Sequence, residues 1–405
     1  MKLLKNSLTY ILALLIILQC YSLLSMLLPN RYFYIAIAVL LLTIIFCGKK
    51  IKQKNSLLLL EIIYVVIMFT LLVNVYYRNM EFLFSVIIPF PLFLMYSIKR
   101  ENIEEFFEAY TNIVFVIACL SLFFFIFGSV LGIVKETGYY PYTTVGWGTN
   151  NYHDYYHLYC EGQEVYALGY SGVRNIALFV EGPMLTYVLS IAFYYELFLR
   201  EKGYRKIYIF VMILTYITSF STTGLLLVLG LLYLKFYTDI KNNKFVRYLF
   251  VPLIIALVIY GGVFILKDKF VSNVYSSSVR TDDILASFKC FLANCINGVG
   301  YQNLHALAPF RRFFRNNAGL STGLGAIFAY GGFTWGIWYL IPLIIAIKNY
   351  ILEPKSRKIM GLILMLNALL LVTVVHSRIL CTITNALSWT FILQTRRNIK
   401  FSFKV

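Results

Sequence analysis

The chain has 405 residues, of which 60% are hydrophobic and only 13% are charged, and its mean hydropathy is +0.75. This composition excludes a water-soluble domain of this length. The formal net charge of +18 comes mostly from short basic stretches between apolar segments, which excludes a nucleic-acid-binding surface. The composition predicts an all-α polytopic membrane protein in which residues 1–405 form a single integral membrane domain.

Apolar segments long enough to cross a bilayer recur along the whole chain. A membrane-spanning helix needs about 20 mainly apolar residues, and this criterion predicts about twelve transmembrane helices. Continuous apolar runs such as Ile11 to Leu18 favour helices over the alternating pattern of a transmembrane barrel. The predicted helices lie near 7–28, 32–47, 56–76, 81–98, 110–134, 183–199, 206–220, 222–237, 247–266, 322–347, 359–375 and 379–394.

Basic residues lie in every second loop between the predicted helices. Arg200 and Arg205, for example, lie in the loop after the sixth helix. Because Lys and Arg near the ends of spans are retained on the cytoplasmic side, this alternation predicts that both termini are cytoplasmic. The same topology leaves two long loops on the outer side, 135–182 and 266–321. The first apolar segment is too long for a cleaved signal peptide and lacks a small-residue cleavage site, so we expect it to be retained.

The first outer loop is rich in tyrosine and also carries Trp147. Such side chains stack on sugars, but they also anchor proteins at the membrane interface, and both interpretations stay open. His153, His157 and Cys160 have a spacing that would place them on one face of a helix, where they could ligate a metal. The spacing matches no strong zinc motif, so we expect no metal.

The end of this loop places an arginine and a glutamate ahead of a predicted helix. Pro183 suits the first position of a helix. Arg174 and Glu181 would then lie near the helix N-terminus, with its partial positive charge and free N–H groups. If 174–181 is helical, both side chains share one face. They form either an interfacial ion pair or part of a functional site.

The second outer loop concentrates arginines. Thr281 or Asp282 is expected to cap a short amphipathic helix, so that Arg280 lies just before its N-terminus. Arg311 and Arg315 are four residues apart and would share a helical face, where planar guanidinium groups suit a diphosphate. Binding of lipid headgroups is the alternative.

Several of these segments, in their order along the chain, resemble the bacterial O-antigen and capsular polysaccharide polymerases and the O-antigen ligases that share their architecture. The resemblance is strongest over residues 170–340. It rests on four segments, which are Arg174 to Pro183, with its Glu-Gly-Pro end; Ser219-Phe-Ser-Thr-Thr-Gly-Leu; Arg280 ahead of Gly298-Val-Gly-Tyr; and Asn316-Asn317 ahead of Gly331-Gly332.

The resemblance implies a glycosyltransferase of the bacterial cytoplasmic (inner) membrane. Such an enzyme polymerises undecaprenyl-diphosphate-linked oligosaccharide repeat units on the outer face, without a metal, a cofactor or a nucleotide sugar. Arg174 and Arg280 match arginines typical of the family and are expected to bind the diphosphate and stabilise the charge that develops as it leaves. Arg311 and Arg315 are assigned to substrate binding by local spacing alone. The expected partners are the lipid-linked substrates, membrane lipids, a flippase and a chain-length regulator.

One departure from the family pattern affects the catalytic assignment. Many relatives have a His-Asn pair where this chain has Asn316-Asn317, and asparagine cannot accept a proton as a base. We therefore expect Glu181, and next Asp282, to act as the general base. Asn317 and Trp147 are assigned to substrate binding.

Two alternative functions stay open. An O-antigen ligase would transfer finished glycan to a lipid or protein acceptor, and the missing histidine disfavours it. A lipid-linked oligosaccharide flippase can also have about twelve spans, but transporters usually place charges near the membrane midplane and often contain repeats. Here charges within the predicted spans are few, Glu61 being the clearest, and the charged constellation lies in the outer loops, which disfavours a transporter.

Overall fold

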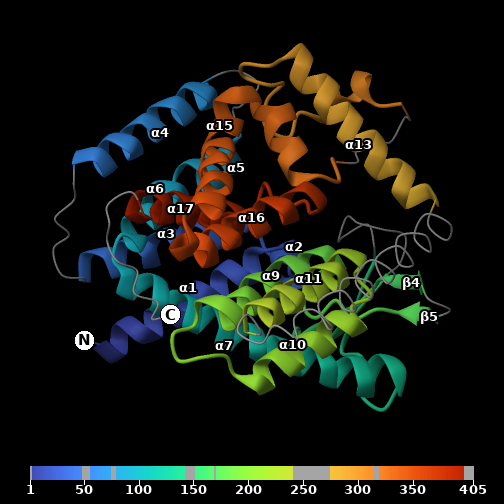
Figure 1. Ribbon diagram of the computed structural model, residues 1–405. Coiled ribbons are helices and arrows are strands. Elements are labelled where there is room, and N and C mark those ends of the chain that lie inside the picture. The colour runs from blue at the N-terminus through green and yellow to red at the C-terminus, as the bar shows by residue number, and fades with distance from the viewer. Residues whose placement is uncertain are drawn as a thin grey trace. The chain divides into compact units, whose positions relative to one another are not determined.

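The structure is a computed structural model that describes residues 2–47, 55–73, 79–141, 151–167, 170–239, 274–312 and 319–395 (Figure 1). The chain forms two compact units. Unit 1 comprises Met1–Cys20, Leu28–Tyr110 and Ser278–Val405. Unit 2 comprises Tyr21–Leu27 and Thr111–Ser277.

Helices dominate unit 1. They are α1 Lys2–Gln19, α3 Asn30–Cys47, α4 Asn55–Val73, α5 Met80–Phe82, the π-helical η2 Leu83–Ile87, α6 Pro89–Ser97, α13 Val274–Ala293, α14 Leu304–Leu307, the 3-10 helix η5 Ala308–Phe310, α15 Gly323–Leu352, the 3-10 helix η6 Pro354–Ser356, α16 Arg357–Val372 and α17 Ile379–Thr395. Within this unit α15 packs against α16 and α17, and α17 packs against α6. Two helices are shared by the units: α7, Arg100–Phe124, begins in unit 1 and ends in unit 2, and the first four residues of α13 belong to unit 2.

Unit 2 contains helices and a group of short strands. Its helices are α2 Leu23–Leu27, the π-helical η3 Phe125–Val130, α9 Gly182–Tyr194, the π-helical η4 Tyr195–Leu199, α10 Lys206–Thr218 and α11 Thr222–Asp239. Helices α9, α10 and α11 pack side by side (Figure 1).

The apolar runs of the sequence form helices because a helix pairs its backbone N–H and C=O groups within one segment, as an apolar environment requires. In the part of the chain that the structure describes, four helices are long and apolar enough to cross a membrane: Met80–Ser97, Glu101–Val130, Gly182–Leu199 and Gly323–Leu352. Shorter apolar helices such as Ile379–Gln394 accompany them. The mainly helical class is therefore confirmed and is compatible with a membrane protein, while the predicted span 247–266 lies outside the described residues.

The predicted span 7–28 is divided into α1 and α2. Tyr21 has a φ of 57°, a left-handed conformation that interrupts a helix. Ser22 instead forms an antiparallel bridge with Phe179, and the Val180 amide donates to the Tyr21 carbonyl (3.0 Å). The segment after α1 therefore pairs with the residues that precede α9.

The loop predicted over 135–182 contains two small antiparallel sheets, which an all-α prediction did not include. Their strands are β1 Gly138–Tyr140, β2 Tyr152–Tyr155 and β3 Tyr159–Glu161 in one sheet, and β4 Glu164–Ala167 and β5 Tyr170–Val173 in the other. Tyr155 and Tyr159 pack with Phe124 and Phe125 at the end of α7. The tyrosine-rich segments of this loop thus form strands, because aromatic rings pack well on a half-buried sheet surface.

Helix α15 is broken at Gly332, whose φ of 55° and ψ of −151° are not helical. At the break, the amide of Phe333 donates to the carbonyl of Cys295 (2.7 Å). A Cβ on Gly332 would lie 2.4 Å from the carbonyl oxygen of Ile296, and one on Gly298 would lie 2.3 Å from the backbone of Tyr330. Glycines on both sides therefore permit a close backbone contact between the turn after α13 and the middle of α15.

Candidate functional site

Arg174 follows β5 and is held beside the start of α9. Its backbone amide donates to the carbonyl of Gln163 (3.0 Å), which extends the pairing of β4 with β5. The Gln163 side-chain oxygen accepts hydrogen bonds from Arg174 Nη2 and from the Gly182 amide (3.1 Å). One glutamine side chain therefore connects the guanidinium to the first residue of α9.

The guanidinium packs against the backbone of α9 because residue 182 is glycine. A Cβ on Gly182 would lie 3.0 Å from Arg174 Cζ. Pro183 lies in the first turn, as predicted. The first N–H groups of α9 are already engaged, because Pro183 has none, the Gly182 amide donates to Gln163 and the Met184 amide donates to the Glu181 carbonyl (3.1 Å). The positive charge of the Arg174 guanidinium adds to the partial positive charge of the helix start, and this favours a nearby anion.

Glu181 does not share a helix face with Arg174. It is the N-cap of α9, with extended backbone (φ −146°, ψ 142°) and no capping hydrogen bond from its side chain. Burial raises the pKa of the Tyr152 phenol, Glu181 raises it further, and Arg174 lowers it. The charges of Arg174 and Glu181 both act on Tyr152, whose hydroxyl donates to the Val180 carbonyl (3.1 Å).

The conditional expectation of a helix over 174–181 is wrong. Ala177 has a φ of 53°, and its amide donates to the side-chain oxygen of Asn175 (2.9 Å). The Asn175 side-chain nitrogen donates in turn to Ser121 (3.2 Å) and Thr218 (3.1 Å). Local side-chain hydrogen bonds thus replace the helical ones in this segment.

The helical face that would have aligned His153, His157 and Cys160 does not form either. These residues lie on a hairpin of β2 and β3, where His153 faces Glu161 across the pair. His157 Nδ1 contacts Asp154 Oδ2 at 2.7 Å. Cys160 is buried, its thiol donates to the Phe179 carbonyl (3.0 Å), and burial raises its pKa well above the usual range. Among the described residues, no three His, Cys, Asp or Glu side chains are grouped to hold a metal.

The second predicted site lies in unit 1, and its helix is longer than predicted. Arg280 lies within α13, which begins at Val274, and not ahead of a capped N-terminus. The Asp282 carboxylate accepts a hydrogen bond from the backbone amide of Arg312 (2.9 Å). The capping prediction fails because Thr281 and Asp282 lie inside α13 and not at its N-terminus.

Arg311 does not lie on a helix. It follows η5 in extended backbone (φ −82°, ψ 147°), and its guanidinium donates to the Gly319 carbonyl (3.0 Å). Arg315, Asn317 and Trp147 lie outside the described residues. Their predicted roles therefore stay predictions.

Unit 1 also contains a buried polar network that the sequence analysis did not single out. The Tyr34 hydroxyl donates to Glu81 (3.1 Å), and Gln19, which is fully buried, accepts from the Ile379 amide (3.0 Å). Arg378, which is 5% exposed, donates to Asn30 (3.2 Å). The sequence signal was Gln19, a polar residue that directly follows a long apolar run.

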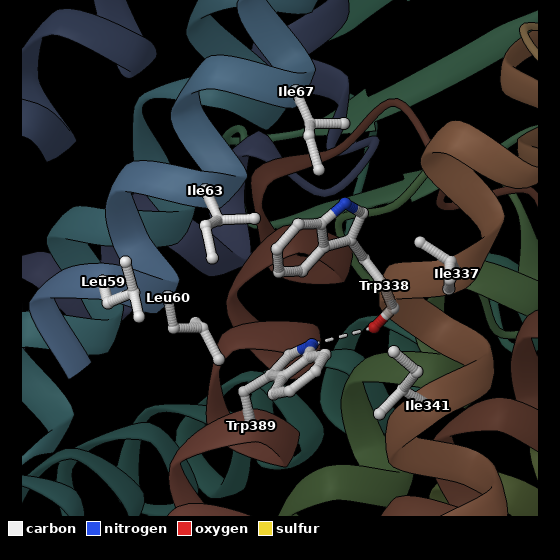
Figure 2. Close-up of a pocket in the computed structure, with 8 residues that line it drawn as sticks. All are labelled: Leu59, Leu60, Ile63, Ile67, Ile337, Trp338, Ile341 and Trp389. Carbon is white, nitrogen blue, oxygen red and sulfur yellow. Dashed lines mark hydrogen bonds between the residues drawn. The ribbon is translucent and has the colours of Figure 1, made fainter. Parts of the chain in front are cut away.

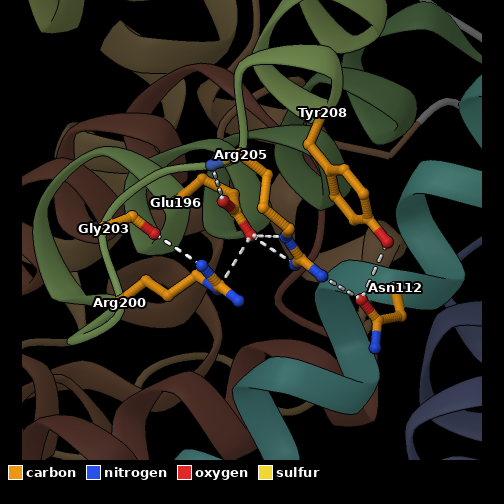
Figure 3. Close-up of polar contacts among 6 residues, drawn as sticks. All are labelled: Asn112, Glu196, Arg200, Gly203, Arg205 and Tyr208. Atoms are coloured by element: carbon orange, nitrogen blue, oxygen red, sulfur yellow. Dashed lines mark hydrogen bonds and ion pairs between the residues drawn. The ribbon is translucent and has the colours of Figure 1, made fainter.

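A second cluster, in unit 2, is built on the basic stretch after the sixth predicted span (Figure 3). The carboxylate of Glu196 is fully buried and accepts from Arg205 Nε (2.9 Å). Arg205 also donates to Asn112 (2.7 Å) and lies 3.5 Å from the ring centroid of Tyr208. Arg205 was predicted as a cytoplasmic anchor; its contacts show that it also joins the start of α10 to η4 and α7.

An apolar cavity of about 340 Å³ lies in unit 1 between α4, α15 and α17. Figure 2 shows the indole nitrogen of Trp389 donating to the Trp338 carbonyl (2.9 Å) at its wall. The remaining lining residues are aliphatic, namely Leu59, Leu60, Ile63, Ile67, Ile337 and Ile341. Its walls suit a hydrocarbon chain and offer no charged group.

Comparison with known protein families, curated proteins and solved structures finds no match for this chain.

Proposed function

We propose that this protein polymerises undecaprenyl-diphosphate-linked oligosaccharide repeat units into O-antigen or capsular polysaccharide at the outer face of the bacterial cytoplasmic membrane. The observation that carries the proposal is the Arg174 guanidinium, held by Gln163 against the N-terminus of α9. A guanidinium suits a diphosphate because it forms charge-assisted hydrogen bonds to phosphate oxygens. The resemblance of the segments around Arg174 and Arg280 to those of the polymerases supports the same substrate.

The proposed topology has about twelve spans, with both termini cytoplasmic and the loops 135–182 and 266–321 outside. It would place the start of α9, and with it Arg174, at the outer face. This is the side on which a lipid-linked repeat unit is available after it has been flipped.

In the proposed reaction, Arg174 binds the diphosphate of the growing chain. Glu181 accepts the proton of a hydroxyl group on the terminal sugar of the incoming unit. The hydroxyl oxygen attacks the anomeric carbon of the growing chain, the bond from that carbon to the diphosphate oxygen breaks, and undecaprenyl diphosphate leaves. Arginine stabilises the negative charge that develops on the leaving group. The energy for the new linkage comes from the diphosphate-linked donor.

The other predicted residues complete the proposal. Arg280 is proposed as a diphosphate-binding arginine by its match to the family. Arg311, Arg315, Asn317 and Trp147 are proposed to bind substrate.

The proposal is tested by the length and sidedness of lipid-linked glycan in cells that lack this protein. We expect single repeat units to accumulate on the outer leaflet, and wild-type protein to restore long chains. Arg174→Ala should reduce polymer by about 100-fold or more, because one preorganised charge contact at a transition state contributes roughly this much. Lys202→Ala, an exposed basic residue of the same unit, is the matched control and should leave chain length unchanged. Normal polymer from Arg174→Ala would contradict the site assignment.

A flippase is the second candidate, and two observations favour it. Glu61 is buried, with 6% exposure, and α15 is broken at Gly332; buried charges and broken helices are both features of transporters. Repeat units trapped on the inner leaflet of the deleted strain would establish this function. Long chains left on undecaprenyl diphosphate would instead indicate a ligase.

A further inference from the structure

Two consecutive carboxylates on α13 hold two separate segments of unit 1. Asp282 and Asp283 are 2% and 1% exposed. Asp282 Oδ1 accepts a hydrogen bond from the Arg312 amide (2.9 Å), and Asp283 Oδ2 accepts one from the Ser321 amide (2.9 Å). The two acceptors therefore reach backbone groups on either side of residues 313–318.

The geometry of the helix explains how neighbours can do this. Consecutive side chains leave a helix about 100° apart, so two adjacent residues point to different parts of the surroundings. The same two segments are also joined directly, because the Arg311 guanidinium donates to the Gly319 carbonyl (3.0 Å). Three contacts thus converge where the chain leaves η5 and where it approaches α15.

The Ser321 contact also fixes the start of α15. Thr322 is the N-cap of that helix and accepts a hydrogen bond from the Gly325 amide (3.3 Å). A Cβ on Gly325 would lie 2.6 Å from Ser287 Oγ, so α13 lies directly against the first turn of α15. Asp283 therefore positions the residue that immediately precedes the cap.

Burying two adjacent carboxylates is costly unless hydrogen bonds compensate for the water that they lose. Hydrogen bonds from backbone amides to a carboxylate are charge-assisted and stronger than those to a neutral acceptor. An asparagine oxygen can accept the same bonds without the charge. Replacement of Asp282 by asparagine therefore separates two roles. The variant could still accept a hydrogen bond from a backbone amide, but it could not accept a proton as a general base.

We propose that Asp282 and Asp283 are positioning residues, which hold the segments on either side of residues 313–318 and so place Arg311 for substrate binding. Asp282 then acts through the backbone and not as the general base of the reaction. We call the contacts of Asp282 with the Arg312 amide and of Asp283 with the Ser321 amide the clamp. The clamp does not depend on the proposed polymerase function, whereas its purpose in substrate binding rests on that function.

Hydrogen exchange of the purified full-length protein tests the clamp independently of activity. Peptides covering residues 308–312 and 319–324 are compared by mass spectrometry between wild type and four variants: Asp282→Asn, Asp282→Ala, Asp283→Asn and Asp283→Ala. We expect each alanine variant to speed exchange in its own peptide by at least about tenfold, and each asparagine variant to stay within about threefold of wild type. Unchanged exchange in the alanine variants would overturn the clamp.

Polymer formation by the same variants tests the positioning role. We expect the alanine variants to lose at least about tenfold in polymer and the asparagine variants to recover most of it, because asparagine still accepts a backbone N–H bond. Lys289→Gln, an exposed position of the same helix, is the control for membrane levels. If Asp282→Asn is as inactive as Asp282→Ala while its amides stay protected, Asp282 is the base and the positioning role is overturned.

The two proposals fail in distinguishable ways. If wild-type protein makes no polymer but the alanine variants still expose the amides, the polymerase function fails and the clamp stands. If polymer forms normally in all four variants, the positioning role fails and the polymerase function stands. An alanine variant that does not accumulate in the membrane is replaced by the matching serine variant, whose shorter side chain should also speed exchange.

Discussion

At the scale of single residues, burial sets the behaviour of His376 in the turn between α16 and α17. The side chain is 5% exposed and its ring lies 5.7 Å from that of Tyr330. Burial, together with the nearby charge of Arg378, lowers the pKa of His376 to about 3. The imidazole therefore stays neutral in the folded protein across the physiological pH range.

This shift predicts a stability that falls with acid. Between pH 6.5 and about 3 the unfolded chain binds a proton at this position and the folded chain does not, so stability present above pH 6.5 is lost as the pH falls. Between pH 7.5 and 5 the unfolding free energy of wild type should fall by about 2 kcal/mol more than that of His376→Gln. Melting temperatures in detergent at the two pH values measure the difference. Equal losses in both proteins would contradict the prediction.

Glu196 is a second residue whose energetics depend on its partners. Its carboxylate is fully buried, and Arg205 is the nearer of two arginines, since Arg200 Nε lies 3.8 Å away. Removal of one partner leaves a buried charge incompletely compensated, which costs more than the intact pair contributes.

Arg205→Ala should therefore destabilise the protein by about 3 kcal/mol. Lys206→Ala removes the exposed basic residue next along the chain and should change stability by less than about 0.5 kcal/mol. The readout is the fraction of protein that stays monodisperse after heating. In Glu196→Gln, Arg205→Ala should cost less than in wild type, because the unpaired charge is gone. Additive costs would show that the pair does not act as a unit.

At the scale of elements, the break in α15 depends on two glycines far apart in the sequence, Gly298 and Gly332. The carbonyls of Cys295 and Ile296 accept the amides of Phe333 and Thr334 (2.7 and 3.0 Å). Gly332 must adopt backbone angles that only glycine adopts readily. The break thus replaces bonds within the helix by bonds to the turn after α13.

Gly332→Ala should cost on the order of 3 kcal/mol or more, because a Cβ would lie 2.4 Å from the Ile296 carbonyl oxygen and the backbone angles would be strained. Gly230→Ala is the control: its Cβ would have no neighbour within 4 Å in α11, and alanine favours a helix by up to about 1 kcal/mol. Membrane levels and melting temperatures are compared. A tolerated Gly332→Ala would contradict the described break.

At the scale of the whole molecule, the proposed topology can be tested at a single thiol. Cys295 is exposed and free, and it belongs to the loop predicted outside. Cys160 and Cys290 are buried, and burial raises the pKa of Cys290 to about 11. A thiol with a raised pKa has little thiolate and reacts slowly.

A membrane-impermeant maleimide should therefore label intact spheroplasts at Cys295. Cys295→Ser should remove this label, and permeabilisation should not be needed to obtain it. Labelling of Cys295 only after permeabilisation would invert the proposed orientation, and with it the side on which the candidate reaction takes place.

Most of the helices could be predicted from the sequence, because a membrane helix depends on the apolarity of one continuous segment. The start of α9 at Gly182–Pro183 and the turn at Gly298 were also predictable, since proline and glycine restrict or free the backbone locally. The small sheets of 135–182 were not, because tyrosine-rich stretches gave no clear alternation.

The candidate site divides in the same way. The sequence by itself determined which residues carry charge, that Arg174 and Glu181 lie next to a helix start, and that Arg280 and Arg311 belong to one long polar segment. Only the tertiary structure decided that Gln163 joins Arg174 to α9, that Asp282 holds the Arg312 amide, and that the buried Gln19 holds the amide of Ile379. These partners are separated by 11, 30 and 360 residues, and local patterns carry no information about pairings that form only when distant segments pack.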